Sequence, residues 1–263
     1  MIHGADLDLI CDAARAGGAL ALDYARNGVK VRTKSDGTPV TDGDEAVDRL
    51  LFERLTAARP DYGWLSEETV DDPLRLRTAR QFIVDPIDGT IAYMKGRPWY
   101  VVSIAVVEDG QTIAAALFAP ALDELYTATR GGGARLNGQP IRASATTVLE
   151  GSAMLGDPHL FRDPRWPTPW PQMRIERRNA IAYRMALVAS GAFDAALALS
   201  AKRDWDLAAA TLVCEEAGAR VTDHRGGELA FNSVGASIPS LICAAPGLHS
   251  EILSRTSFLN LPT

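Results

Sequence analysis

The chain has 263 residues, which is enough for one large domain or two closely packed halves. Apolar residues make up 47% of it, which excludes a disordered chain, and a formal net charge of −6 gives no general support for nucleic-acid binding. Cys11, Cys214 and Cys243 form no CxxC motif and no pairable framework, as is typical of a reducing compartment. The N-terminus lacks the features of a signal peptide, and no apolar run reaches membrane-spanning length. We therefore expect a cytoplasmic protein that binds neither membrane nor nucleic acid.

The first half of the chain predicts two helices followed by a run of short strands. Apolar spacing predicts a helix over 5–26 and another over 42–59, with Thr41 as its N-cap and Asp44 three residues further on. The sequence Glu-Asp-Gly at 108–110 is typical of a hairpin turn, so the first sheet should be partly antiparallel. The predicted strands are 62–66, 81–85, 100–107, 112–118 and 124–128.

The second half repeats the alternation of strands and helices after residue 140. The segment 158–172 is rich in proline and tryptophan and predicts a loop or irregular cover. Alternating helices and strands in both halves favour a layered α/β architecture, which we divide into 1–140 and 141–263. The predicted elements here are strands 153–155, 193–199 and 241–244, and helices 180–190, 204–217 and 247–254.

The stretch FIVDPIDGT places two carboxylates, Asp85 and Asp88, at the end of an apolar strand. Two close anions repel each other, and burial makes each one costlier, so a positive group should accompany them unless the stretch is only a turn. Glu67 and Glu68 follow another strand, and Asp206 lies in the first turn of a helix. Each of these has a simpler interpretation, as a solvated loop acid or a helix cap.

The functional interpretation is a magnesium site for phosphate chemistry. Hard divalent cations take oxygen ligands, and Asp85, Asp88 and the Ile87 carbonyl between them offer three. With Glu67 and Asp206 added, there are enough oxygens for two Mg²⁺ ions that share Asp85 and clamp a phosphate ester. The amides of Gly89 and Thr90 could hold phosphate oxygens.

Three motifs resemble those of the inositol monophosphatase family in order and spacing: WLSEET, DPIDGT and DWDLAAATLVCEEAGA. The resemblance runs from about Ala5 to Leu253. It implies a layered α-β-α-β-α sugar-phosphatase fold, similar to that of the fructose bisphosphatases. It also implies a magnesium-dependent, lithium-sensitive phosphomonoesterase with two or three ions that acts on a small phosphorylated metabolite. Members are commonly dimeric, so we expect a homodimer.

The resemblance also assigns roles to residues by position. Thr90, paired with the acid that matches Asp42, is expected to orient the attacking water, and Glu67 to act in catalysis as well as in metal binding. The amides of Gly89 and Thr90 are expected to hold the phosphate, whereas Glu68 is a less certain ligand and Trp205 structural. The implied metal ligands are Glu67, Asp85, the Ile87 carbonyl, Asp88 and Asp206.

Departures from the family pattern bear on the substrate. Inositol-specific members carry a glutamate where this chain has Leu199, and a Gly-Ser/Thr pair where it has Asn179-Ala180. The basic residues Arg184, Lys202 and Arg203 could instead bind a second phosphate or another anion, or could simply be solvated surface charges. The open alternatives are therefore an inositol-phosphate phosphatase, a 3′(2′),5′-bisphosphate nucleotidase and a histidinol-phosphatase. A regulatory partner of the transcription machinery is the non-enzymatic alternative.

Overall fold

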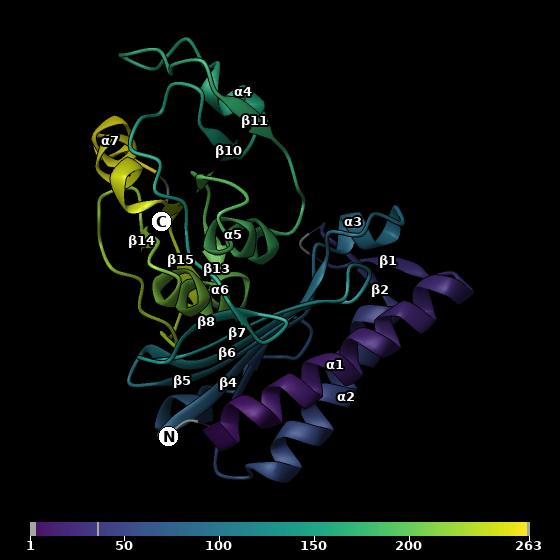
Figure 1. The fold of residues 1–263 in the computed structure, drawn as a ribbon. Helices are drawn as coiled ribbons and strands as arrows, with labels where there is room; N and C mark the ends of the chain where they lie inside the picture. Colours follow the sequence, from purple (N-terminus) through teal and green to yellow (C-terminus); the bar gives the residue numbers. More distant parts are fainter. Residues whose placement is uncertain (1–3, 36, 262–263) are drawn as a thin grey trace.

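The computed structural model describes residues 4–35 and 37–261. Its elements form five layers, with helices and sheets alternating from the N-terminal helix pair to the C-terminal helix (Figure 1). This order confirms the predicted layered α-β-α-β-α fold.

The first sheet has the strand order β3-β4-β5-β6-β7-β8-β9, with β3 and β4 parallel and the other neighbours antiparallel. Asp109 and Gly110, both with positive φ, form the predicted hairpin turn between β5 and β6. The strands are β3 (Gly63–Ser66), β4 (Arg80–Asp88), β5 (Val101–Glu108), β6 (Gln111–Ala119), β7 (Glu124–Thr129), β8 (Gly133–Leu136) and β9 (Gln139–Pro140).

Helices cover both faces of this sheet. On one face, α1 (Gly4–Asn27) packs on β5 and β6, and α2 (Asp42–Ala58) packs on β4. On the other face, α5 (Ile181–Ala189) and α6 (Asp204–Glu216) lie between the two sheets (Figure 1). The capping box predicted at the start of α2 is present, because Thr41 and Asp44 exchange hydrogen bonds.

The second sheet has the order β11-β10-β12-β16-β14 and packs against α5 and α6 on one side and α7 on the other. Its strands are β10 (Ala153–Leu155), β11 (Arg174–Glu176), β12 (Ala195–Ala198), β14 (Arg220–Thr222) and β16 (Leu241–Ala244), and α7 spans Pro246–Thr256.

Several short elements were not predicted from the sequence. They include the hairpin of β1 (Val31–Thr33) and β2 (Pro39–Thr41), and α4 (Pro158–Phe161) inside the segment predicted as a loop. The others are the 3₁₀ helix Pro73–Arg77, α3 (Thr90–Met94), β13 (Lys202–Arg203), β15 (Ser237–Ile238) and the short strands β8, β9, β11 and β14.

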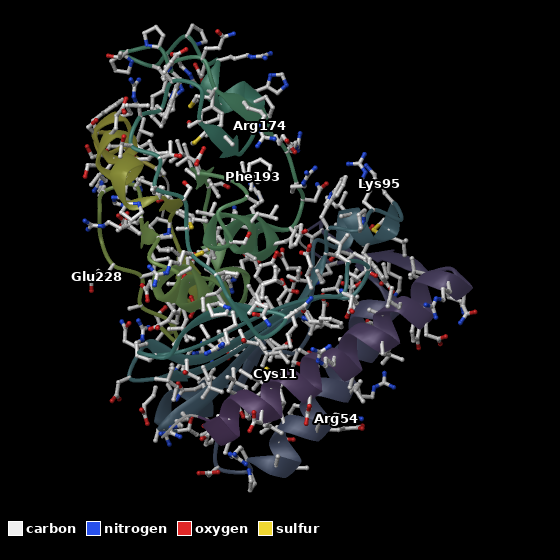
Figure 2. The ribbon with its side chains drawn as sticks, viewed as in Figure 1. Cys11, Arg54, Lys95, Arg174, Phe193 and Glu228 are labelled. Carbon is white, nitrogen blue, oxygen red and sulfur yellow. The ribbon has the colours of Figure 1, made fainter. Side chains whose placement is uncertain are left out.

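Apolar side chains fill the spaces between the layers (Figure 2). One cluster joins the two sheets through α5 and α6, from Leu65 on β3 to Cys243 on β16, so the two sheets share a core. Cys11, Cys214 and Cys243 are free thiols. Within the described ranges, every helix is too short or too polar to cross a bilayer.

Candidate metal centre and catalytic site

The end of β4 carries the two aspartates of the DPIDGT motif. The pairing of β4 with β5 shifts register between Asp85 and Asp88, because Pro86 and Ile87 are accommodated there as an irregularity. Both carboxylates are buried, with 1% and 5% exposure. The Asp85 Oδ1 atom accepts a hydrogen bond from the Ile87 amide at 3.0 Å, which orients its carboxylate.

Asp85 meets two carboxylates from other elements. Ligand atoms of Glu67, Asp85 and Asp206 all lie within 4.8 Å of one another. Glu67 directly follows β3, where its amide donates to the Val84 carbonyl at 3.3 Å, and Asp206 lies in the first turn of α6. Segments that are remote in sequence thus converge on one point, as the sequence predicted.

The carboxylates of this cluster are unfavourable in their ionised form unless a cation lies between them. Burial, followed by the charges of Glu67 and Asp88, raises the pKa of Asp85 well above its usual range. Burial likewise raises the pKa of Asp206 to about 6, although the Arg203 amide donates to its carboxylate. Three hard oxygen donors that destabilise one another when ionised fit a hard divalent cation, which would neutralise them on binding.

Asp88 connects this site to the second half of the chain. Its two carboxylate oxygens accept hydrogen bonds from the amides of Ile181 and Ala182, at 3.1 and 2.7 Å, where α5 begins. An acid is stabilised there by the positive end of the helix. Asp88 lines the same small cavity as the other three acids, about 180 Å³ in volume, but lies outside the cluster that Glu67, Asp85 and Asp206 form.

Thr90 pairs with Asp44 and not with Asp42, so the predicted pairing is wrong. The Thr90 hydroxyl donates to Asp44 Oδ1 at 3.1 Å, whereas Asp42 accepts the exposed amide of Lys30 at 2.9 Å. Asp42 is the first residue of α2 and points away, while Asp44 reaches back to the cap residue Thr41. The capping box was the sequence signal that could have identified Asp44.

Asp44→Asn should lower kcat for phosphate release by about 100-fold or more, the usual effect of removing a group that assists proton transfer. Asp42→Asn should change kcat less than about threefold, since its carboxylate contacts an exposed amide. Circular dichroism checks that both variants fold. Equal losses in the two variants would contradict the assignment of Asp44.

A lysine that the sequence interpretation missed contacts the same acids. Lys34, in the turn between β1 and β2, places its Nζ 2.9 Å from Glu67 and 2.7 Å from Glu68. Burial lowers the pKa of Lys34, but the charges and hydrogen bonds of the two glutamates outweigh it and raise that pKa above its ordinary value. The lysine therefore neutralises part of the acidic cluster.

The model of the inositol monophosphatase family matches residues 6–259. The chain belongs to this family.

Relatives within the family carry different names. A histidinol-phosphatase from Chlorobaculum parvum is 37% identical over 84% of this chain and 86% of its own length. An inositol-1-monophosphatase from Rhizobium meliloti is 35% identical over 86% and 88%. A Nus factor SuhB from Pasteurella multocida is 31% identical over 92% of each chain. In structure, the extragenic suppressor protein suhB from Bartonella henselae matches with a TM-score of 0.85, 28% identity, and coverage of 97% and 99%.

Gly89, whose amide is predicted to hold phosphate, lies in a position that requires glycine. Gly89 has φ of +98°, and a Cβ atom there would lie 2.9 Å from the Cβ of Ala180. Only glycine suits both the left-handed conformation and this close approach. Gly89 and Thr90 line the small cavity beside Asp85 and Asp206, where their predicted contact with phosphate stays a prediction.

The basic residues separate into two groups. Arg184 and Lys202 line a larger cavity of about 520 Å³, together with Leu199 and Asn179. Arg203 lines neither cavity; its guanidinium lies over the Trp205 ring, 5.0 Å from the centroid. The prediction that Arg203 contacts substrate is therefore not supported, because its side chain packs on the neighbouring ring.

Proposed function

We propose that this protein hydrolyses a small phosphate monoester in a magnesium-dependent reaction, by attack of water on phosphorus. The observation that carries this proposal is the convergence of Glu67, Asp85 and Asp206 beside the Thr90–Asp44 pair. The names of the two phosphatase relatives support the same reaction class.

In this proposal, Glu67, Asp85, Asp206, Asp88 and the Ile87 carbonyl would hold the ions. Bound Mg²⁺ would supply Lewis-acid stabilisation of the phosphate oxygens and would lower the pKa of a coordinated water. The chain itself supplies orientation and proton acceptance.

Thr90 and Asp44 form the orienting pair. Since the Thr90 hydroxyl donates a hydrogen bond to Asp44, its oxygen lone pairs are left to accept a hydrogen bond from the attacking water. A proton released by the water would pass to Thr90 as the Thr90 proton passes to Asp44. Asp44 is in turn held by the Thr41 hydroxyl at 2.5 Å and by the Thr41 amide at 2.9 Å. These contacts fix the direction in which Thr90 presents its oxygen, and such positioning accelerates the reaction.

The direct test is phosphate release from a panel of esters, with Mg²⁺ and with EDTA. The panel should contain inositol 1-phosphate, histidinol phosphate and adenosine 3′,5′-bisphosphate. We expect turnover that requires Mg²⁺ and that lithium inhibits. Equal rates in Mg²⁺ and EDTA would contradict the proposal.

A regulatory role in transcription is the second candidate, favoured by the relative named Nus factor SuhB. The same panel separates the two candidates. Magnesium-dependent turnover of any ester supports the enzyme, whereas no turnover together with tight binding to a transcription protein supports the regulatory role. The predicted homodimer stays a prediction that light scattering can test.

A further inference from the structure

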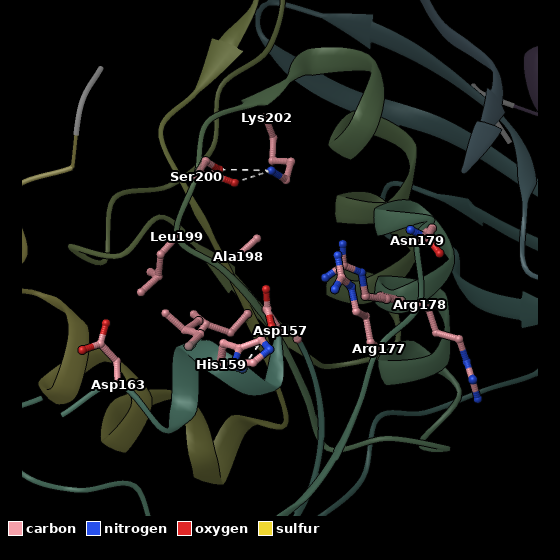
Figure 3. Close-up of a pocket in the computed structure, with 14 residues that line it drawn as sticks. Asp157, His159, Asp163, Arg177, Arg178, Asn179, Ala198, Leu199, Ser200 and Lys202 are labelled. Carbon is pink, nitrogen blue, oxygen red and sulfur yellow. Dashed lines mark hydrogen bonds between the residues drawn. The ribbon is translucent and has the colours of Figure 1, made fainter. Parts of the chain in front are cut away.

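The cavity of about 520 Å³ adjoins the carboxylate site, because Asn179 lines both cavities. Lys202 lies on one side of it, and Asp157 and His159 lie on the opposite side (Figure 3). A phosphate ester held at the metal site would therefore direct its alcohol portion toward this second cavity. The charges and hydrogen-bonding groups that line this cavity therefore determine which alcohol portion it accepts.

Two of the charged residues around the cavity are already paired. Arg178 forms an ion pair with Glu176 at 2.8 Å, and its guanidinium lies 4.5 Å from the centre of the Trp99 ring. Figure 3 shows its side chain extending away from Lys202. Asp163 is paired with Arg165 at 2.6 Å. These side chains contribute little net charge to the cavity.

The remaining charged residues leave the cavity positive. Arg177, Arg184 and Lys202 line it, against the single carboxylate of Asp157, which accepts the His159 amide as a helix cap. Among the described residues, Lys202 donates only to neutral oxygens, which are the Ser200 hydroxyl and the carbonyls of Ser200 and Ala201. Three cations facing one anion favour an anionic ligand.

Arg184 gives the strongest indication. Its Nε atom is buried without a hydrogen-bond partner in the part of the chain that the structure describes. A buried guanidinium donor left unpaired carries a desolvation cost, and the like charges of Arg177 and Lys202 add to it. A ligand anion would pair with the Arg184 donor and would also reduce the repulsion among the three cations.

Arg184 could instead serve only to balance Asp88 and Asp206, whose charges attract it. An ion pair would be the expected geometry for that role. The Asp88 oxygens, however, are held by the amides of Ile181 and Ala182, and Asp206 is held by the Arg203 amide. Charge balance therefore leaves the donor atom of Arg184 unexplained.

We propose that this cavity binds a second anionic group, a phosphate or a carboxylate, on the alcohol portion of the substrate, through Arg184, Arg177 and Lys202. The inference rests on the proposed phosphatase function and narrows its substrate class. Leu199 agrees with this substrate class, because the cavity wall at that position offers an apolar side chain and no carboxylate that would accept hydrogen bonds from ring hydroxyls.

The test compares two pairs of esters that differ mainly in the second group. Adenosine 3′,5′-bisphosphate and 3′-AMP differ by a phosphate, whereas 6-phosphogluconate and sorbitol 6-phosphate differ by a carboxylate. With Mg²⁺ present, kcat/KM should be at least about tenfold higher for the doubly anionic member of one pair, the effect of one charge-assisted contact. The pair that shows the preference identifies the anion.

The variants locate the preference. Arg184→Gln should reduce the ratio within that pair by about tenfold, and Arg177→Gln, at an exposed position, provides a second variant should the buried change prevent folding. Arg54→Gln is the control, since it also removes one positive charge but lies at an exposed position on α2, outside both cavities (Figure 2). Because each variant is judged by the ratio of kcat/KM between the two members of a pair, a general loss of activity does not affect the result.

Binding without turnover gives a second readout. In EDTA, calorimetry should detect 5′-AMP binding at least about tenfold tighter than adenosine if the anion is phosphate, and Arg184→Gln should remove the difference.

Turnover of both members of each pair at equal kcat/KM would overturn the second-anion site without contradicting the phosphatase activity. A preference that survives both Arg184→Gln and Arg177→Gln would also overturn it. No turnover of these four esters, together with turnover of inositol 1-phosphate or histidinol phosphate, would also overturn it. No turnover of any of these esters would count against the phosphatase itself.

Discussion

Replacing Asp85 by asparagine should reduce magnesium-dependent phosphate release by about 1,000-fold or more. The change removes the carboxylate at the centre of the cluster with Glu67 and Asp206, and metal stabilisation of the transition state is worth several kcal/mol. Asparagine keeps an oxygen for the Ile87 amide, so the local turn should survive. The measurement is kcat for phosphate release at saturating ester and Mg²⁺.

The same variant should be more stable than the wild type when metal is absent. Burial and neighbouring negative charges disfavour an ionised Asp85, so its neutral replacement relieves that repulsion. Chemical denaturation in EDTA should show a free energy of unfolding higher by about 1 kcal/mol or more. Asp23→Asn, at an exposed position on α1, is the control and should change neither quantity. Wild-type turnover in Asp85→Asn would remove Asp85 from the metal centre.

Gly89→Ala should lower both stability and activity. A left-handed conformation costs a non-glycine residue about 1–2 kcal/mol, and overpacking adds about 1–3 kcal/mol. The added Cβ would meet Ala180 at 2.9 Å, so relief requires the start of α5 to move away from β4. That movement would disturb the amides of Ile181 and Ala182 that hold Asp88. Denaturation should show a loss of about 2–5 kcal/mol, accompanied by a lower kcat.

Gly96→Ala separates the two causes. Gly96 also has positive φ, +60°, but a Cβ atom there would meet nothing within 4 Å. Gly96→Ala should therefore lose about 1–2 kcal/mol of unfolding free energy, the cost of the left-handed conformation alone, and should keep its kcat. If the two variants lost equal stability and both kept wild-type turnover, the contact with Ala180 would have no role in shaping the site.

The acids of the site could be predicted because they lie at the ends of strongly patterned elements. Asp85 follows the apolar run of β4, and Asp206 opens a helix whose pattern is clear in the sequence. Glu67 follows β3, which is short but pairs in parallel with β4, so both strands end at the same edge of the sheet. The layered fold followed from the same alternation of elements.

The errors arose where side-chain direction decides the outcome. Asp42 and Asp44 are separated by one residue, and only the rotation of α2 relative to its cap brings Asp44 to Thr90. Arg203 and Lys202 are adjacent, yet one packs on Trp205 and the other lines the cavity. Lys34 lies on a hairpin of two three-residue strands, too short for a periodic pattern, so its contact with Glu67 could not be anticipated.

We propose that Glu67, Asp85 and Asp206 bind the catalytic metal. Crystals grown with Mn²⁺, which has a similar preference for oxygen ligands, allow the ion to be located by its anomalous scattering. We expect an anomalous peak within coordination distance of all three carboxylates. Anomalous density that is absent from these side chains, in crystals of protein whose activity Mn²⁺ supports, would contradict it.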